Sequence, residues 1–210
     1  STSFMHNITQ TDFTEWSFGW SQRGDLLYTA TVRQDQMSDE LIVMNRLGMP
    51  HFVETPDTLY SFGSVWSPDA STLAYFSSHP ANYSDIYVVT FSDATVRNVS
   101  NTQSISETNP QWSPDSQHLL YLSLGNLFSV ELSSNQVTLI ADMENTIEAP
   151  VWSPDGQRIA FSVQITDKGR TVNQAYTIAA NGDDLRALLL DTPPNSSVSW
   201  SPDSQQVAVI

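Results

Sequence analysis

The four residues Trp-Ser-Pro-Asp occur four times along the chain, beginning at Trp66, Trp112, Trp152 and Trp200. A fifth, degenerate copy begins at Trp20 and lacks the Pro and the Asp. Successive tryptophans are separated by 40 to 48 residues, and recurrence at such an interval indicates one supersecondary unit copied along the chain. The repeat constrains the fold more than any other feature of the sequence.

Each copy is typical of a strand that ends in a tight turn. Serine suits the first position of a type I turn, and proline fixes φ for the second. The aspartate accepts hydrogen bonds from nearby backbone N–H groups, so we interpret it as part of the turn and not as a catalytic group. The tryptophan is predicted to fill the wedge between neighbouring units. The predicted structural residues are Trp20, Trp66, Pro68, Asp69, Trp112, Pro114, Asp115, Trp152, Pro154, Asp155, Gly156, Trp200, Pro202 and Asp203.

The residue after each Asp is expected to adopt a left-handed conformation, which completes the hairpin. Gly156 takes this conformation without steric cost, whereas Ala70, Ser116 and Ser204 fit it less well. An apolar, β-rich run follows every turn. The third unit, for example, is predicted to have strands at 119–123, 126–131 and 136–141 after the strand that ends in its Trp.

Four strands per unit and no helical periodicity predict an all-β fold, a β-propeller built of four-stranded antiparallel blades. The propeller is expected to be incomplete in this chain, with about four full blades and partial blades at both ends, so the chain would be part of a larger protein or complex. Residues 1–9 would be the outer strand of a preceding blade and 192–210 the start of a further one. The full blades are predicted at 10–56, 57–101, 102–142 and 143–191.

Two further patterns accompany the repeat. A Pro stands two residues before the Trp at Pro110 and Pro150, and the run Asp85-Ile86-Tyr87-Val88-Val89 has the composition of a third blade strand. With these patterns the units resemble the WSPDG-type, WD40-like repeats of TolB-like propellers. The resemblance implies a periplasmic, extracellular or envelope-associated location. Propellers of this type serve as adaptors, as peptidase gates and as ligand binders, and a protein-binding scaffold is the role that we prefer.

The bulk charge excludes some partners. The chain has 8 Lys+Arg against 23 Asp+Glu, a formal net charge of −15, which opposes binding to nucleic acid or to an anionic membrane surface. It has no cysteine, so disulfides and thiolate metal sites are excluded. No apolar run is long enough to span a bilayer, so direct membrane insertion is not expected.

Acidic residues gather in the loops that a propeller places on one face. These are the loops before the first strand of each blade and the loops between its second and third strands, including a predicted loop at 165–173. The resulting acidic rim could meet a basic protein partner or hold a cation such as calcium, although no cofactor is predicted. The candidate partner-binding residues are Glu54, Asp57, Glu107, Asp142, Glu144, Glu148, Asp167 and Asp191.

Motifs of catalysis are missing from the sequence. It contains no Gly-x-Ser-x-Gly nucleophile elbow and no phosphate-binding Gly loop, and its four histidines lack metal-ligand spacing. We therefore expect a non-catalytic protein–protein interaction module. The first alternative is the substrate-gating propeller of a prolyl-oligopeptidase-type serine peptidase whose catalytic domain lies elsewhere. The second is a sugar- or metal-binding propeller.

Overall fold

The computed structural model describes residues 14–24, 26–32, 39–45, 50–53, 60–78, 81, 83–93, 95–102, 105–167, 169–192 and 197–209. Within these ranges every regular element is a β-strand. The first sheet contains β1 (Thr14–Trp20), β2 (Leu26–Val32), β3 (Asp39–Asn45) and β4 (Pro50–Val53). The second contains β5 (Tyr60–Trp66), β6 (Thr72–Ser78), β7 (Ser84–Thr90) and β8 (Thr95–Asn98).

Two more four-stranded sheets and one two-stranded sheet follow. The third contains β9 (Glu107–Trp112), β10 (His118–Ser123), β11 (Asn126–Glu131) and β12 (Gln136–Ala141). The fourth contains β13 (Ile147–Trp152), β14 (Arg158–Asp167), β15 (Arg170–Ala179) and β16 (Arg186–Thr192). The last contains β17 (Val198–Trp200) and β18 (Val207–Val209).

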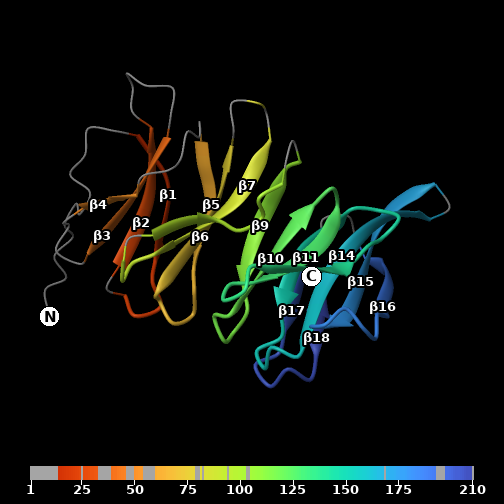
Figure 1. Cartoon of the computed structure of the whole chain (residues 1–210). Coiled ribbons are helices and arrows are strands. Elements are labelled where there is room, and N and C mark those ends of the chain that lie inside the picture. The colour runs from red at the N-terminus through yellow and green to blue at the C-terminus, as the bar shows by residue number, and fades with distance from the viewer. Residues whose placement is uncertain are drawn as a thin grey trace, which may run out of the picture.

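Each sheet is an antiparallel meander in which strands pair in chain order, and the sheets succeed one another across Figure 1. The predicted all-β fold of four-stranded antiparallel blades, incomplete in this chain, is confirmed. We number the sheets as blades 1 to 5. The predicted outer strand at 1–9 lies outside the described residues.

The hairpin of β14 and β15 is longer than the sequence suggested. Residues 165–173, predicted as a loop, continue the ladder as far as the pair Asp167↔Arg170. Ile165 pairs with Val172 and Thr166 with Thr171, and β-branched residues of this kind favour extended pairing. The expected loop is therefore wrong, and only a tight turn joins the two strands.

Most of the hydrophobic core lies between blades. Between blades 3 and 4, Leu120 and Leu127 pack with Ile159 and Phe161. The seam between blades 2 and 3 combines residues such as Val88 with residues of blade 3, and blades 1 and 2 share a smaller cluster. Because each sheet buries side chains on both faces, every blade depends on its neighbours for stability.

One aromatic pair stacks across the second and third strands of each of blades 2, 3 and 4. The ring centroids of Tyr75 and Tyr87 are 5.7 Å apart. The equivalent register partners of the next two blades, Tyr121 with Phe128 and Phe161 with Tyr176, stack at 5.6 Å. Cross-strand aromatic pairs stabilise a sheet beyond the area they bury.

The Trp-Ser-Pro-Asp turn has the same geometry in all four copies. In blade 3 the Ser113 hydroxyl is hydrogen-bonded to Asp115 Oδ1, and that carboxylate accepts the backbone N–H of Gln117 at 3.0 Å. The N–H of Ser116 bonds the Ser113 carbonyl at 3.0 Å and its φ is +62°. The motif aspartates therefore bind their own turns. Equivalent bonds hold the turns that contain Asp69, Asp155 and Asp203.

Three of the motif tryptophans tie one blade to the preceding one. The indole Nε1–H of Trp66 donates to the Gly19 carbonyl at 3.1 Å, that of Trp112 to Val65 at 3.0 Å, and that of Trp200 to Val151 at 3.3 Å. The buried indole nitrogen of Trp152 has no acceptor among the described residues. The seam between blades 3 and 4 thus departs from the pattern at this point.

Candidate interaction surface on the loop face

The blades have two ends, which we call the turn face and the loop face. The turn face carries the Trp-Ser-Pro-Asp turns. The loop face carries the hairpins between second and third strands and the connections from one blade to the next. The backbone N–H of Ile147, where blade 4 begins, donates to the Gly125 carbonyl in the β10–β11 hairpin at 2.9 Å, which places these two loops side by side.

The β10–β11 hairpin presents an exposed leucine. Ser123 pairs with Asn126, so the loop has only two residues, Leu124 with φ +50° and Gly125 with φ +81°. Such tight hairpins favour Asn-Gly, because Asn tolerates the left-handed conformation better than other non-glycine residues. The Leu124 side chain is 78% exposed. Its strained backbone is therefore not offset by burial of its side chain.

The hairpin tip is pressed against the neighbouring loop. A Cβ atom on Gly125 would lie 3.3 Å from the Thr146 Cα atom, so the tip can approach this closely only with glycine at that position. The same loop carries the exposed carboxylates Asp142 and Glu144. We call Leu124, Asp142 and Glu144 the loop-face patch: one exposed apolar side chain on the hairpin and two exposed carboxylates on the adjacent loop.

Glu148 lies at the edge of this arrangement. It is half-buried in β13, and its backbone carbonyl accepts the Ser162 hydroxyl at 3.4 Å. Its carboxylate therefore follows the loop-face patch along the chain but comes from the inner strand of blade 4.

Glu107 does not belong to an exposed surface, and its predicted place on the partner-binding face is wrong. Its side chain is 0% exposed, and its Oε1 atom accepts hydrogen bonds from the hydroxyls of Thr102 at 2.7 Å and Ser123 at 3.2 Å. Burial, as the main cause, raises the pKa of the Glu107 carboxyl above its usual value. A loop position in the sequence did not reveal that blade 2 covers this residue.

The remaining candidates are only partly described. Asp167 ends β14 and Asp191 lies in β16, and in both cases the backbone alone is described. Glu54 and Asp57 lie outside the described residues. Sequence reasoning missed Leu124 as a binding residue, although the predicted strands at 119–123 and 126–131 already left it in a two-residue hairpin loop.

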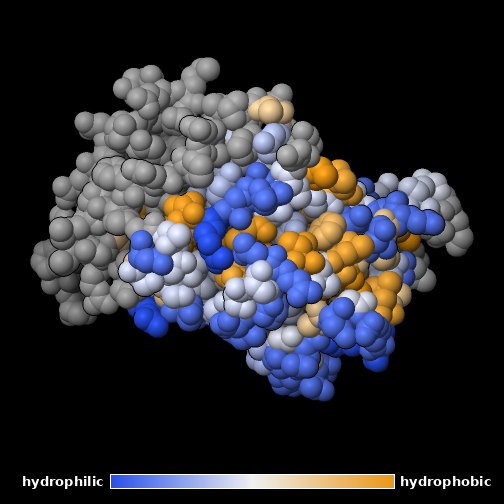
Figure 2. All heavy atoms as spheres, in the orientation of Figure 1, coloured by the Kyte–Doolittle hydropathy of each residue, from blue (hydrophilic) through white to orange (hydrophobic). Residues whose placement is uncertain are grey.

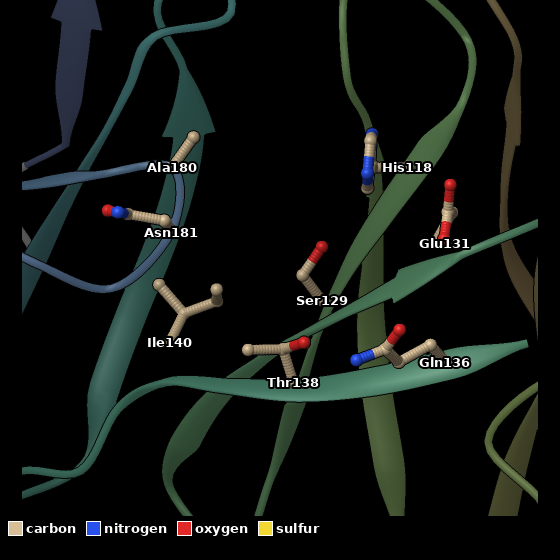
Figure 3. A pocket seen from close by; sticks show the side chains of 8 residues that line it. All are labelled: His118, Ser129, Glu131, Gln136, Thr138, Ile140, Ala180 and Asn181. Atoms are coloured by element: carbon tan, nitrogen blue, oxygen red, sulfur yellow. The ribbon is translucent and has the colours of Figure 1, made fainter.

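A polar groove of about 430 Å³ opens at the seam between blades 3 and 4. Figure 3 shows His118, Ser129 and Glu131 on one wall and Asn181 on the loop opposite. His118 also contacts Trp152, with ring centroids 6.5 Å apart, at the indole that lacks an acceptor. The Glu131 carboxylate is hydrogen-bonded to Ser134 at 2.6 Å, which lowers the pKa of Glu131.

Within the described ranges, no group of three or more His, Cys, Asp or Glu side chains is arranged to hold a metal ion. The described residues also include no helix long and apolar enough to cross a membrane. Figure 2 shows polar and apolar residues interspersed over the visible part of the described surface.

We compared the chain with family models, with curated proteins and with solved structures. No family model matches the chain. The uncharacterized peptidase YuxL of Bacillus subtilis is 29% identical over 119 residues, which cover 51% of this chain and 18% of that protein. The chain thus spans less than a fifth of this curated relative.

Solved structures share the fold over nearly the whole chain. TolB from Acinetobacter baumannii is 16% identical with a TM-score of 0.63, and the match covers 95% of this chain and 49% of that one. Oligogalacturonate lyase from Vibrio parahaemolyticus is 12% identical with a TM-score of 0.73, over 96% of this chain and 64% of that one. The chain is therefore a TolB-like β-propeller in fold, and propellers of this type include enzymes.

Proposed function

We propose that this chain is a non-catalytic TolB-like propeller that works as a protein-binding scaffold outside the cytoplasm. Its contact surface is the loop-face patch, and its partner presents basic side chains around an apolar socket. The likeness to TolB supports the choice of class. The location rests on the resemblance of the repeats to those of TolB-like propellers.

The exposed, strained Leu124 is the observation that carries this proposal. A left-handed non-glycine residue costs roughly 1–2 kcal/mol, and strain of this kind is concentrated at functional sites. An apolar side chain that is 78% exposed at the tip of a two-residue hairpin gains nothing for the fold. It can gain contact area when a partner covers it, as central apolar anchors do in protein interfaces.

The negative charge of the loop-face patch and of the whole chain favours a basic partner. Asp142 and Glu144 are exposed in the adjacent loop, and the whole chain has a net charge of −15. A negative surface of this strength accelerates association with basic partners and disfavours acidic ones. We therefore expect binding to weaken as salt rises.

A defined peptide library tests the patch. Fluorescence polarisation would be measured with labelled peptides that carry Lys or Arg around one central apolar residue, at low and at physiological salt. Binding should be lost in Leu124→Asn and in the double variant Asp142→Lys with Glu144→Lys. The matched control is Leu185→Asn, because Leu185 is also exposed, at 47%, but lies in a turn-face hairpin. Equal binding by Leu124→Asn and the unmodified chain would contradict the proposal.

The peptidase YuxL favours a second candidate. In that case the chain would be the propeller of a larger serine peptidase and would filter substrates for a hydrolase domain. The full-length coding sequence would decide between them. A nucleophile elbow followed by Asp and His would support the peptidase.

A further inference from the structure

The buried Glu107 occupies an unusual place between blades 2 and 3. It begins β9, and the first strand of blade 3 approaches the third strand of blade 2 there. The Ser84 hydroxyl of β7 donates to the Glu107 carbonyl at 2.8 Å. Two hydroxyls, from Thr102 and Ser123, bind the Oε1 atom. The Oε1 atom of Glu107 thus accepts two hydrogen bonds from protein hydroxyl groups.

The other oxygen, Glu107 Oε2, is buried and has no hydrogen-bond donor among the described residues. Asp85 of β7, which is 3% exposed, directly follows Ser84 and lies beside the Glu107 carboxyl, as does the Ser100 hydroxyl. The Asp85 carboxylate accepts from Asn98 Nδ2 at 2.9 Å and from the Ser100 hydroxyl at 3.3 Å. Two ionised carboxylates are acceptors only, so they cannot bond each other without a positive charge between them.

The seam between blades 3 and 4 lacks this pair. By strand register, Ile147 of blade 4 corresponds to Glu107, and Asn126 of blade 3 corresponds to Asp85. Ile147 is fully buried in its own seam. The fold therefore needs no carboxyl group at either position, and a buried like-charge pair is costly unless it is neutralised.

We propose that Glu107 binds a proton against Asp85, that this proton joins blades 2 and 3 at the loop face, and that the seam loosens when the proton is lost. The protonated Glu107 carboxyl group donates to Asp85 across the seam. Without the proton, two buried charges repel between β7 and β9, next to the connection between the blades. The inference is independent of the proposed partner.

The titratable groups that the structure describes around Glu107 add no positive charge to it. Tyr121 of β10 faces Glu107, and burial, reinforced by that carboxyl, raises the Tyr121 pKa. On β7, burial and then the Asp85 charge raise the pKa of Tyr87, and Tyr83 adds to this effect. Arg97 of β8 is bonded elsewhere, to the Leu132 carbonyl at 3.3 Å. A proton is thus the simplest positive charge for the site.

The direction of the pH dependence follows from the Glu107 pKa. Burial raises the pKa of this carboxyl in the folded chain, so the folded state binds the proton more tightly than the unfolded state. The stabilisation is fully present below the unfolded Glu pKa of about 4.3 and is lost as pH rises through the folded pKa. Between the unfolded and the folded pKa of Glu107, the unfolding equilibrium constant should rise by up to about tenfold per pH unit.

Urea unfolding of the unmodified chain and of Glu107→Gln, from pH 4.5 to 9 in EDTA, tests the site. The glutamine amide can donate to Asp85 at every pH. The unfolding constant of the unmodified chain should therefore rise with pH relative to that of the variant, by up to about tenfold per pH unit between those two pKa values. The control is Glu148→Gln, a half-buried carboxyl on β13, whose profile should run parallel to that of the unmodified chain. Parallel profiles for Glu107→Gln and the unmodified chain would overturn the proposal.

Two further measurements cover other outcomes. If Glu107→Gln does not fold, NMR of side-chain carboxyl carbons in the unmodified chain should show one carboxyl that titrates above the others. Titration of every carboxyl below about pH 5 would overturn the proposal, because solvated Asp and Glu titrate near 3.9 and 4.3. Restoration of stability at pH 8 by calcium chloride would also overturn it, since a metal ion and not a proton would then occupy the site.

Discussion

The hydroxyl oxygen of Ser116 accepts a hydrogen bond from the backbone N–H of Asp69 at 3.2 Å. It thereby joins the turn of blade 3 to the turn of blade 2. Ser204 and Asp155 repeat the bond between blades 5 and 4 at 3.0 Å. Serine at the left-handed position of the turn costs backbone strain, and its hydrogen bond to the neighbouring blade offsets this cost.

Replacement of Ser116 should separate these two effects. Ser116→Ala keeps the left-handed φ of +62° but loses the bond between turns, so we expect a loss of about 0.5 to 1 kcal/mol in the free energy of unfolding. Ser116→Gly loses the bond but relieves the strain, so its loss should be smaller. Urea unfolding measures both. A larger loss for Gly than for Ala would show that the left-handed conformation at this position is not strained.

The turn aspartates should make the fold sensitive to acid. Hydrogen bonds from Ser153 and from the Gln157 N–H lower the pKa of Asp155. The stabilisation from such a group is present above the unfolded Asp pKa of about 3.9 and is lost as pH falls through the folded pKa. Asp155→Asn should therefore destabilise the chain at pH 7 and make little difference at pH 2.5. Thermal unfolding at the two pH values compares them, and an equal difference at both would contradict the linkage.

Leu124→Asn should stabilise the isolated chain. Asn tolerates the φ of +50° at this position, and Asn-Gly is a preferred two-residue hairpin sequence, so we expect a gain of about 1 kcal/mol. Differential scanning calorimetry would show the gain as a higher midpoint. Loss of stability would mean that Leu124 contributes to packing and would weaken its role as a binding anchor.

Gly63→Ala should be among the most damaging single changes in the described blades. Gly63 has φ +58°, and a Cβ atom there would lie 2.5 Å from Phe76 Cε1. Strain at such positions costs about 1–3 kcal/mol before any clash. Gly24→Ala is the control, because its φ is +66° but nothing lies within 4 Å of the added atom. Similar losses for both variants in urea unfolding would show that Phe76 moves aside freely.

The sequence predicted the fold well because the determinants of a blade are local. Turn residues and alternating strands recur in every repeat, so β10 to β12 lie within one residue of their predicted positions. The site was harder to predict. The burial of Glu107 depends on blade 2, which the repeat that contains Glu107 does not encode. The two-residue loop that exposes Leu124 was implied by the predicted strands at 119–123 and 126–131, but its role was not recognised. The loop predicted at 165–173 failed because β-branched residues extended a ladder past its expected end.

The location of the core between sheets has a consequence for how such a chain can grow. A seam recognises only the two surfaces that meet in it, whatever the number of units on either side. Duplication or deletion of one whole repeat within a row of blades therefore leaves most seams intact. Residues that occur at only some seams, such as the Asp85 and Glu107 pair, then determine which two blades pack against each other.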